Sequence, residues 1–263
     1  MLVKLMKYEF RSSALLIVDR LSIFGLTVLD NTNLEFAKIL SAGSVFMLCF
    51  LTVLAIFALF CLPLLFSAIR FYRSTATDEG YLTFTLPVKT EQIIFSKLLV
   101  ALIWEAATAL LAIVLGVLFF MSFDVRSTLE VLQLFPESFF RNISEYPFWG
   151  AYFAEFLVAL PLYAAHGILQ SYSAISIGQA CGRHKLLASI GIYIGMQFAV
   201  SFLSQMLTVP VMFASFRSTD TSLRILQDTF FLSMALNLLL IAGLLVVQFL
   251  LCRYFLKKKL NLS

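Results

Sequence analysis

Polar side chains recur deep within the long apolar stretches of this chain, at spacings that suit one face of a helix. The members of this set that could do chemistry are Glu105, Glu155, His166, Gln170 and Gln197. At about 100° per residue, Glu155, His166 and Gln170 fall within about 60° of one another on a helical wheel. In hydrocarbon, such side chains face a helix bundle or a cavity. They are therefore candidates to line a translocation path, where Glu105 or Glu155 would meet a cationic part of a cargo.

A structural role competes with this interpretation for each residue. Glutamine and serine side chains between transmembrane helices often only hydrogen-bond to one another, which contributes under about 1–2 kcal/mol per contact. Pairing with Arg or Lys is the rival role for Glu105 and Glu155, and a hydrogen-bonded helix contact is the rival role for His166. The other histidine, His184, lies in a basic turn, so no metal site is expected.

The composition defines the elements that must position these residues. The chain has 263 residues, of which 61% are hydrophobic and 13% are charged. A soluble domain is about 45–50% apolar and about 25% charged, and its interior could not hide this much apolar surface. The sequence therefore predicts an all-α polytopic membrane protein with a single transmembrane domain over 1–263.

Six apolar stretches predict six transmembrane helices. They lie at about 12–32, 39–69, 97–123, 149–178, 186–209 and 229–252. The first is interrupted by Asp19 and Arg20, each of which costs about 2.5–3.5 kcal/mol at a helix centre when unpaired. It is counted as a span because both termini are rich in Lys and Arg, and two cytoplasmic ends require an even number of crossings. Pro63 is expected to kink the second span.

The segments between the spans have distinct characters. Residues 1–11 place Lys4, Lys7 and Arg11 on one side, which favours a helix in the membrane interface, although a charged overhang would look the same. Residues 124–148 mix apolar and charged positions and suit a helix on the outer surface. Most of the 19 Lys and Arg residues lie on one side if both termini are cytoplasmic. We expect a multi-pass protein of the cell membrane in that orientation.

Three groups of residues carry a family resemblance. They are KLMKYEFR from Lys4, RFYRSTATDEGYLTFTLPVKTEQIIFSKLLVALIW from Arg70, and the pair AISIGQACGRHKLLAS from Ala174 and YFLKKKLNL from Tyr254. Together they resemble the membrane subunit of a type-2 ABC exporter, of the compact six-span kind common in Gram-positive bacteria. The resemblance implies a permease that pairs with a second permease chain, identical or different, and with two ABC ATPase subunits. ATP and Mg would be bound on those partners.

The resemblance also assigns a role to the polar segment 70–96, which would supply a cytosolic coupling helix between spans two and three. The candidate ATPase-coupling residues are Arg70, Arg73, Asp78, Glu79, Tyr81 and Phe84. Aromatic and apolar side chains in the segment, Phe71 and Tyr72 among them, would offer the ATPase a docking surface. The alternative is that these aromatics form a belt at the headgroup level. Thr90 and Glu91 can start the helix that leads into the third span.

The sequence favours transport over catalysis. It contains no GxxxxGK[ST] loop to cradle phosphates, so the chain is not expected to be an enzyme or to hold a cofactor. No basic patch interleaves with aromatics in a polar segment, so nucleic acid is not an expected partner. The predicted function is a permease for an amphiphilic cargo such as a peptide, a lipid or an antimicrobial compound. An ATP-independent secondary transporter or a membrane scaffold is the alternative.

Overall fold

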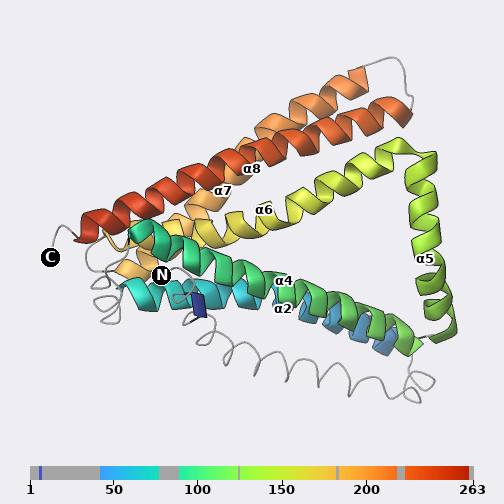
Figure 1. Ribbon diagram of the computed structural model, residues 1–263, viewed down its shortest axis with the longest axis horizontal. Helices are drawn as coiled ribbons and strands as arrows, with labels where there is room; N and C mark the ends of the chain where they lie inside the picture. The colour runs from blue at the N-terminus through green and yellow to red at the C-terminus, as the bar shows by residue number, and fades with distance from the viewer. Residues whose placement is uncertain are drawn as a thin grey trace. The chain divides into compact units, whose positions relative to one another are not determined.

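The computed structural model describes residues 6–7, 42–76, 89–123, 125–181, 184–217 and 223–260, and this part of the chain is all-α (Figure 1). It contains six helices. They are α2 (Ala42–Ala76), α4 (Thr90–Phe123), α5 (Val125–Glu145), α6 (Pro147–Gly178), α7 (Lys185–Arg217) and α8 (Leu223–Leu260).

Four of these helices are long and apolar enough to cross a membrane. The crossing segments are Thr90–Leu118, Phe148–Gly178, Lys185–Phe213 and Gln227–Lys257. Most of their apolar surface is exposed: in the most apolar part of α7 only 6% of the residues are buried, and in α4 28%. Exposed apolar surface on this scale is stable in lipid and not in water. These helices indicate a polytopic membrane protein.

The helices follow the predicted apolar stretches. The third to sixth predicted spans fall in α4, α6, α7 and α8, and α2 covers most of the second and runs through Pro63 without a break. The first predicted span lies outside the described residues, as does the N-terminal interfacial helix except for Met6 and Lys7, which are helical. The total of six spans and the cytoplasmic location of both termini stay predictions.

The observed helices are longer than the predicted spans. Helix α2 continues to Ala76 and α4 begins at Thr90, so the polar segment 70–96 is helical at both of its ends. The stretch between the fifth and sixth predicted spans is likewise shortened, because α7 continues to Arg217 and α8 begins at Leu223. Hydropathy locates the edge of the hydrocarbon, whereas a helix continues for as long as its backbone hydrogen bonds and side-chain contacts support it.

The chain divides into two compact units. The first unit comprises Met1–Ser67 and Leu99–Gly150, and the second comprises Ala68–Leu98 and Ala151–Ser263. In the first unit, Val100 and Trp104 of α4 are buried together, and Met6 packs against them. The second unit holds most of α6 and all of α7 and α8, together with the end of α2 and the beginning of α4.

Hydrogen bonds join the three long helices of the second unit. The Tyr152 hydroxyl of α6 donates to the Gln227 carbonyl of α8 over 2.6 Å. The Ser204 hydroxyl of α7 donates to Asn237 Oδ1 of α8 over 2.5 Å. Helices α7 and α8 pack against each other, and Figure 1 shows them running alongside one another in orange and red. Because apolar side chains gain nothing by leaving lipid, such polar contacts and close packing hold membrane helices together.

Helices α6 and α7 approach most closely at the corner that joins them. A Cβ placed on Gly178 would lie 2.7 Å from both the Cα and the backbone nitrogen of Ser189. Backbone atoms cannot move aside as a flexible side chain can. Helices α6 and α7 can therefore approach this closely because Gly178 has no side chain.

We expect Gly178→Ala to destabilise the protein by about 1–3 kcal/mol, because the new methyl group overlaps the backbone of α7. Gly191→Ala is the matched control, since no atom lies within 4 Å of the Cβ position there. Alanine has the higher helix propensity, so that change should be neutral or stabilising by up to about 1 kcal/mol. Thermal unfolding in detergent micelles compares the two variants. Equal melting temperatures would contradict the close approach.

Candidate coupling site

Tyr172, in the second-last turn of α6, contacts the ends of two other helices in the second unit. Its ring stacks on Phe71 of α2, with centroids 4.1 Å apart and planes 10° from parallel. Both side chains are almost fully buried, with exposures of 2% and 1%. The Tyr172 hydroxyl donates to the Lys97 carbonyl of α4 over a long 3.5 Å. Stacking of this kind contributes about 0.5–1.5 kcal/mol beyond the burial of the rings.

The last turn of α2 is also held by a polar contact. Gln179, in the turn that follows α6, donates from Nε2 to the Thr75 hydroxyl over 3.0 Å. The same hydroxyl donates to the Phe71 carbonyl one turn earlier over 2.6 Å. Both side chains are buried. A buried hydrogen bond with good geometry fixes the relative positions of the groups it joins, because breaking it leaves polar atoms away from water.

An ion pair holds the first turn of α4. Arg253 Nη2 of α8 lies 2.8 Å from Glu91 Oε1. The two side chains are 38% and 40% exposed, so solvent screens the pair and it contributes less than about 1 kcal/mol. Ile94 and Leu256, each within one turn of the pair, are fully buried. The ion pair therefore joins the first turn of α4 to α8 close to buried apolar side chains of both helices.

These contacts form one arrangement, which we call the stem clamp: Phe71, Thr75, Glu91, Tyr172, Gln179 and Arg253. Thr75 lies just before the segment 77–88 and Glu91 just after it. The stem clamp thus fixes both stems of this segment, one to α6 and its following turn and the other to α8. Figure 1 shows the corresponding helix ends gathered at the left. A force on the segment would be transmitted to both helices.

The predicted coupling residues are only partly described. Arg70 is half-buried and Arg73 is exposed, both near the end of α2, while Asp78, Glu79, Tyr81 and Phe84 lie outside the described residues. Phe71, expected to offer apolar surface to a partner, is instead buried against Tyr172. The difference arises because α2 remains helical to Ala76, which directs Phe71 into the second unit and not to the surface.

The predicted polar face of α6 is buried. Glu155, His166 and Gln170 are each no more than 9% exposed. Gln170 Nε2 donates to Gln197 Oε1 of α7 over 3.0 Å, which is the interhelical contact that the structural alternative predicts. Nδ1 of His166 has no hydrogen-bond partner among the described residues. Within the described ranges, no three His, Cys, Asp or Glu residues are grouped so that they could hold a metal ion.

The two candidate carboxyl groups have different surroundings. Neither carboxyl oxygen of Glu155 has a hydrogen-bond partner among the described residues, and the same holds for Oε1 of Glu105. Glu155 belongs to the second unit, whereas Glu105, half-buried in α4, belongs to the first. The structure thus does not bring them together within one unit. A lone carboxylate in hydrocarbon costs several kcal/mol, so Glu155 requires a partner, a cargo or a proton.

Sequence reasoning missed the contacts of the stem clamp. Glu91 was expected only to help start a helix, and α4 does begin at Thr90. One feature of the sequence could have indicated that Glu91 pairs with Arg253: the two residues carry opposite charges and lie at the ends of two apolar stretches. The Gln179–Thr75 hydrogen bond had none, because the two residues are 104 positions apart.

Compared with protein-family models, with curated proteins and with solved structures, the chain matches none of them.

A double-mutant cycle tests the contact between α2 and the α6–α7 turn. We expect Thr75→Val and Gln179→Leu each to lower the free energy of unfolding by about 1 kcal/mol, because each removes the buried hydrogen bond. The double variant should then cost less than the sum, with a coupling energy of about 1 kcal/mol. Denaturant titration in mixed micelles gives all four stabilities. Strict additivity would mean that the hydrogen bond contributes nothing.

Proposed function

We propose that this chain is the permease subunit of an ATP-driven exporter, which forms the translocation path for an amphiphilic cargo and couples to separate ATPase subunits. The observation that carries the proposal is the stem clamp. A loop that merely joins two spans has no need for specific side-chain contacts at both of its ends. A loop that transmits force does need them, because a mobile stem would absorb the displacement.

The division of labour between subunits follows from the sequence. The chain has no phosphate-cradling loop, so ATP and Mg would be bound by two ABC ATPase subunits. A second permease chain would complete the path. The residues Asp78, Glu79, Tyr81 and Phe84 offer charge and aromatic surface between the two fixed stems, and that mixture suits a protein interface.

The transmission step is mechanical. Movement of segment 77–88 by an ATPase would pull on Thr75 and Glu91, and through Gln179 and Arg253 it would shift the ends of α6 and α8. Helix α6 is buried at nearly every residue from Ile168 to Gly178 but is largely exposed between Ala151 and Val158. Helix α6 would therefore move as one body that is attached to its neighbours at its buried C-terminal end.

The path would follow the polar face of α6. Glu155 is buried on this face with no hydrogen-bond partner among the described side chains. A cationic group on the cargo would compensate its charge during passage. Because an uncompensated charge is expensive in hydrocarbon, this carboxyl group is the strongest candidate for contact with cargo.

Association with the ATPase tests the docking assignment. When the chain is co-expressed with a candidate ABC ATPase, we expect Asp78→Lys together with Glu79→Lys to lower the co-purified ATPase at least about tenfold, and Tyr81→Ala together with Phe84→Ala to do the same. The matched control is Glu137→Lys, a charge reversal on α5 at the other end of α4, which should leave association unchanged.

Two outcomes would overturn this proposal. If both double variants bind the ATPase as well as the parent chain does, segment 77–88 is not the docking site. If the parent chain binds no ABC ATPase and moves cargo without ATP, it is a secondary transporter. Thr75→Val should separate docking from transmission, because it leaves the docking residues intact while it loosens one stem.

Cargo-stimulated ATPase activity tests the path. We expect Glu155→Gln to reduce the stimulation by a cationic amphiphile about tenfold or more while the ATPase remains associated, because the neutral amide no longer attracts the cation. Glu105→Gln is measured separately, since Glu105 lies in the other unit. Glu137→Gln on exposed α5 is the control and should have no effect. If cargo still stimulates the ATPase activity fully in both the Glu105 and the Glu155 variant, these residues have a structural role and do not contact cargo.

A further inference from the structure

Helix α5 carries most of its apolar side chains on one arc and its charged side chains on another, with Leu134 as an exception among the charged residues, and none of its residues is buried. The apolar residues that share one arc are Val125, Leu129, Leu132, Phe139, Phe140 and Ile143. On a helical wheel they span about 100°. The charged residues occupy the opposite arc: Arg126, Glu130, Glu137, Arg141 and Glu145. Within the described structure, no side chain of the apolar arc is buried.

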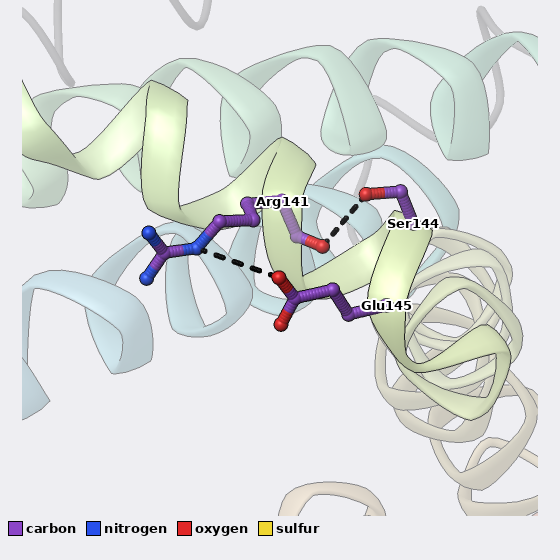
Figure 2. A network of polar contacts seen from close by, with 3 residues as sticks. All are labelled: Arg141, Ser144 and Glu145. Carbon is purple, nitrogen blue, oxygen red and sulfur yellow. Dashed lines mark hydrogen bonds and ion pairs between the residues drawn. The ribbon is translucent and has the colours of Figure 1, made fainter.

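The charged residues of α5 are exposed to solvent, and four of them form ion pairs with one another. Arg126 pairs with Glu130 at 3.4 Å and Arg141 with Glu145 at 4.0 Å, each one helical turn apart. Figure 2 shows the second pair, together with Ser144, whose hydroxyl donates to the Arg141 carbonyl over 2.8 Å. Two arginines and three glutamates give the helix a net charge of −1. The pairs largely neutralise one another, so this face carries no strong field.

The ends of α5 are fixed at the membrane. Its first residue, Val125, comes two positions after the end of α4, and its last, Glu145, comes two positions before the start of α6. Both neighbouring helices are candidate spans. A helix of 21 residues is about 31 Å long, and α5 continues as one helix through Pro136. With both ends at one face of the bilayer, it lies along that face and does not project from it.

The junction between α5 and α6 has the composition of an interface. Tyr146 and Trp149 are about half exposed, and Phe148 contacts both, with ring centroids 5.7 and 5.8 Å away. Tyrosine and tryptophan concentrate at the level of lipid headgroups, where an amphipathic ring meets both water and hydrocarbon. This places the last turn of α5 at headgroup depth.

We propose that the apolar face of α5 is seated in the boundary between the headgroups and the acyl chains of a phospholipid bilayer. Lipid is the occupant because both ends of the helix are tethered at the membrane and its apolar arc needs a cover that lies along the same plane. With a net charge of −1, burial of apolar side chains drives the insertion, and attraction to anionic lipid does not. The helix thereby holds the adjoining ends of α4 and α6 at the bilayer surface.

Tryptophan quenching by brominated lipid tests the seating. Phe140→Trp places the probe on the apolar face, and Glu137→Trp places it on the charged face nearly one turn away. Both positions are exposed, so both variants should fold. The full chain is reconstituted in phosphatidylcholine vesicles with or without bromine on the acyl chains. The native Trp104 and Trp149 are kept, and their signal is subtracted with the parent protein.

We expect brominated lipid to remove at least about half of the added fluorescence of Phe140→Trp and little of that of Glu137→Trp. Leu129→Trp, a second position on the apolar arc, should repeat the result. Raising the salt from about 0.05 to about 1 M, or adding anionic lipid, should leave the quenching unchanged.

Three results would overturn the proposal. Equal quenching at Phe140 and Glu137 would mean that α5 has no lipid-facing side. Protection of Phe140→Trp from both brominated lipid and aqueous iodide would mean that a second copy of the chain covers the face. Loss of quenching at high salt would mean that charge, and not apolar burial, holds the helix on the membrane.

Discussion

Tyr172 holds the ends of two helices at once, because its ring stacks on Phe71 of α2 and its hydroxyl donates to the Lys97 carbonyl of α4. The contacts of Thr75 with Gln179 and of Glu91 with Arg253 join the same two helices to the turn after α6 and to α8. Nearly every residue of α6 from Ile168 to Gly178 is buried, whereas its first turns are largely exposed. The second unit is thus tightly packed at one end, and its cohesion depends on this cluster.

The uneven packing suits the proposed transport function. Helices α7 and α8 expose most of their apolar surface, so lipid or another chain must cover them. Contacts such as Gln170 with Gln197 and Ser204 with Asn237 are few, and each contributes little in a membrane. Helices joined by such contacts can shift against one another at low cost, while the stem clamp keeps one end of the unit together. A transporter that alternates between states needs both properties.

The sequence predicted which of the described segments form helices, but it did not predict the side-chain contacts between those helices. Apolar stretches predicted helices α2, α4, α6, α7 and α8, the mixed segment 124–148 predicted α5, and the helical wheel predicted the buried face of α6 with Glu155, His166 and Gln170. The predicted helix ends were wrong because hydropathy indicates where the chain leaves the hydrocarbon and not where backbone hydrogen bonding ends. For the same reason, Phe71 was wrongly predicted to lie at the surface. The stem clamp could not be predicted, since Gln179 and Thr75 share no local pattern. The residues Asp78, Glu79, Tyr81 and Phe84 remain predictions of the sequence alone.

The pairing of Glu91 with Arg253 has a consequence for biosynthesis. Arg253 belongs to α8, so the ribosome must make α5, α6, α7 and most of α8 before this partner becomes available to α4. Helices that insert one after another into the bilayer must wait, with the stems of segment 77–88 incompletely fixed, until α8 emerges. A nascent or truncated chain that lacks α8 would leave Glu91 unpaired and Ser176 without Cys252. Closure of this end therefore follows the synthesis of α8, and it distinguishes a chain in which α8 is in place from one in which it is not.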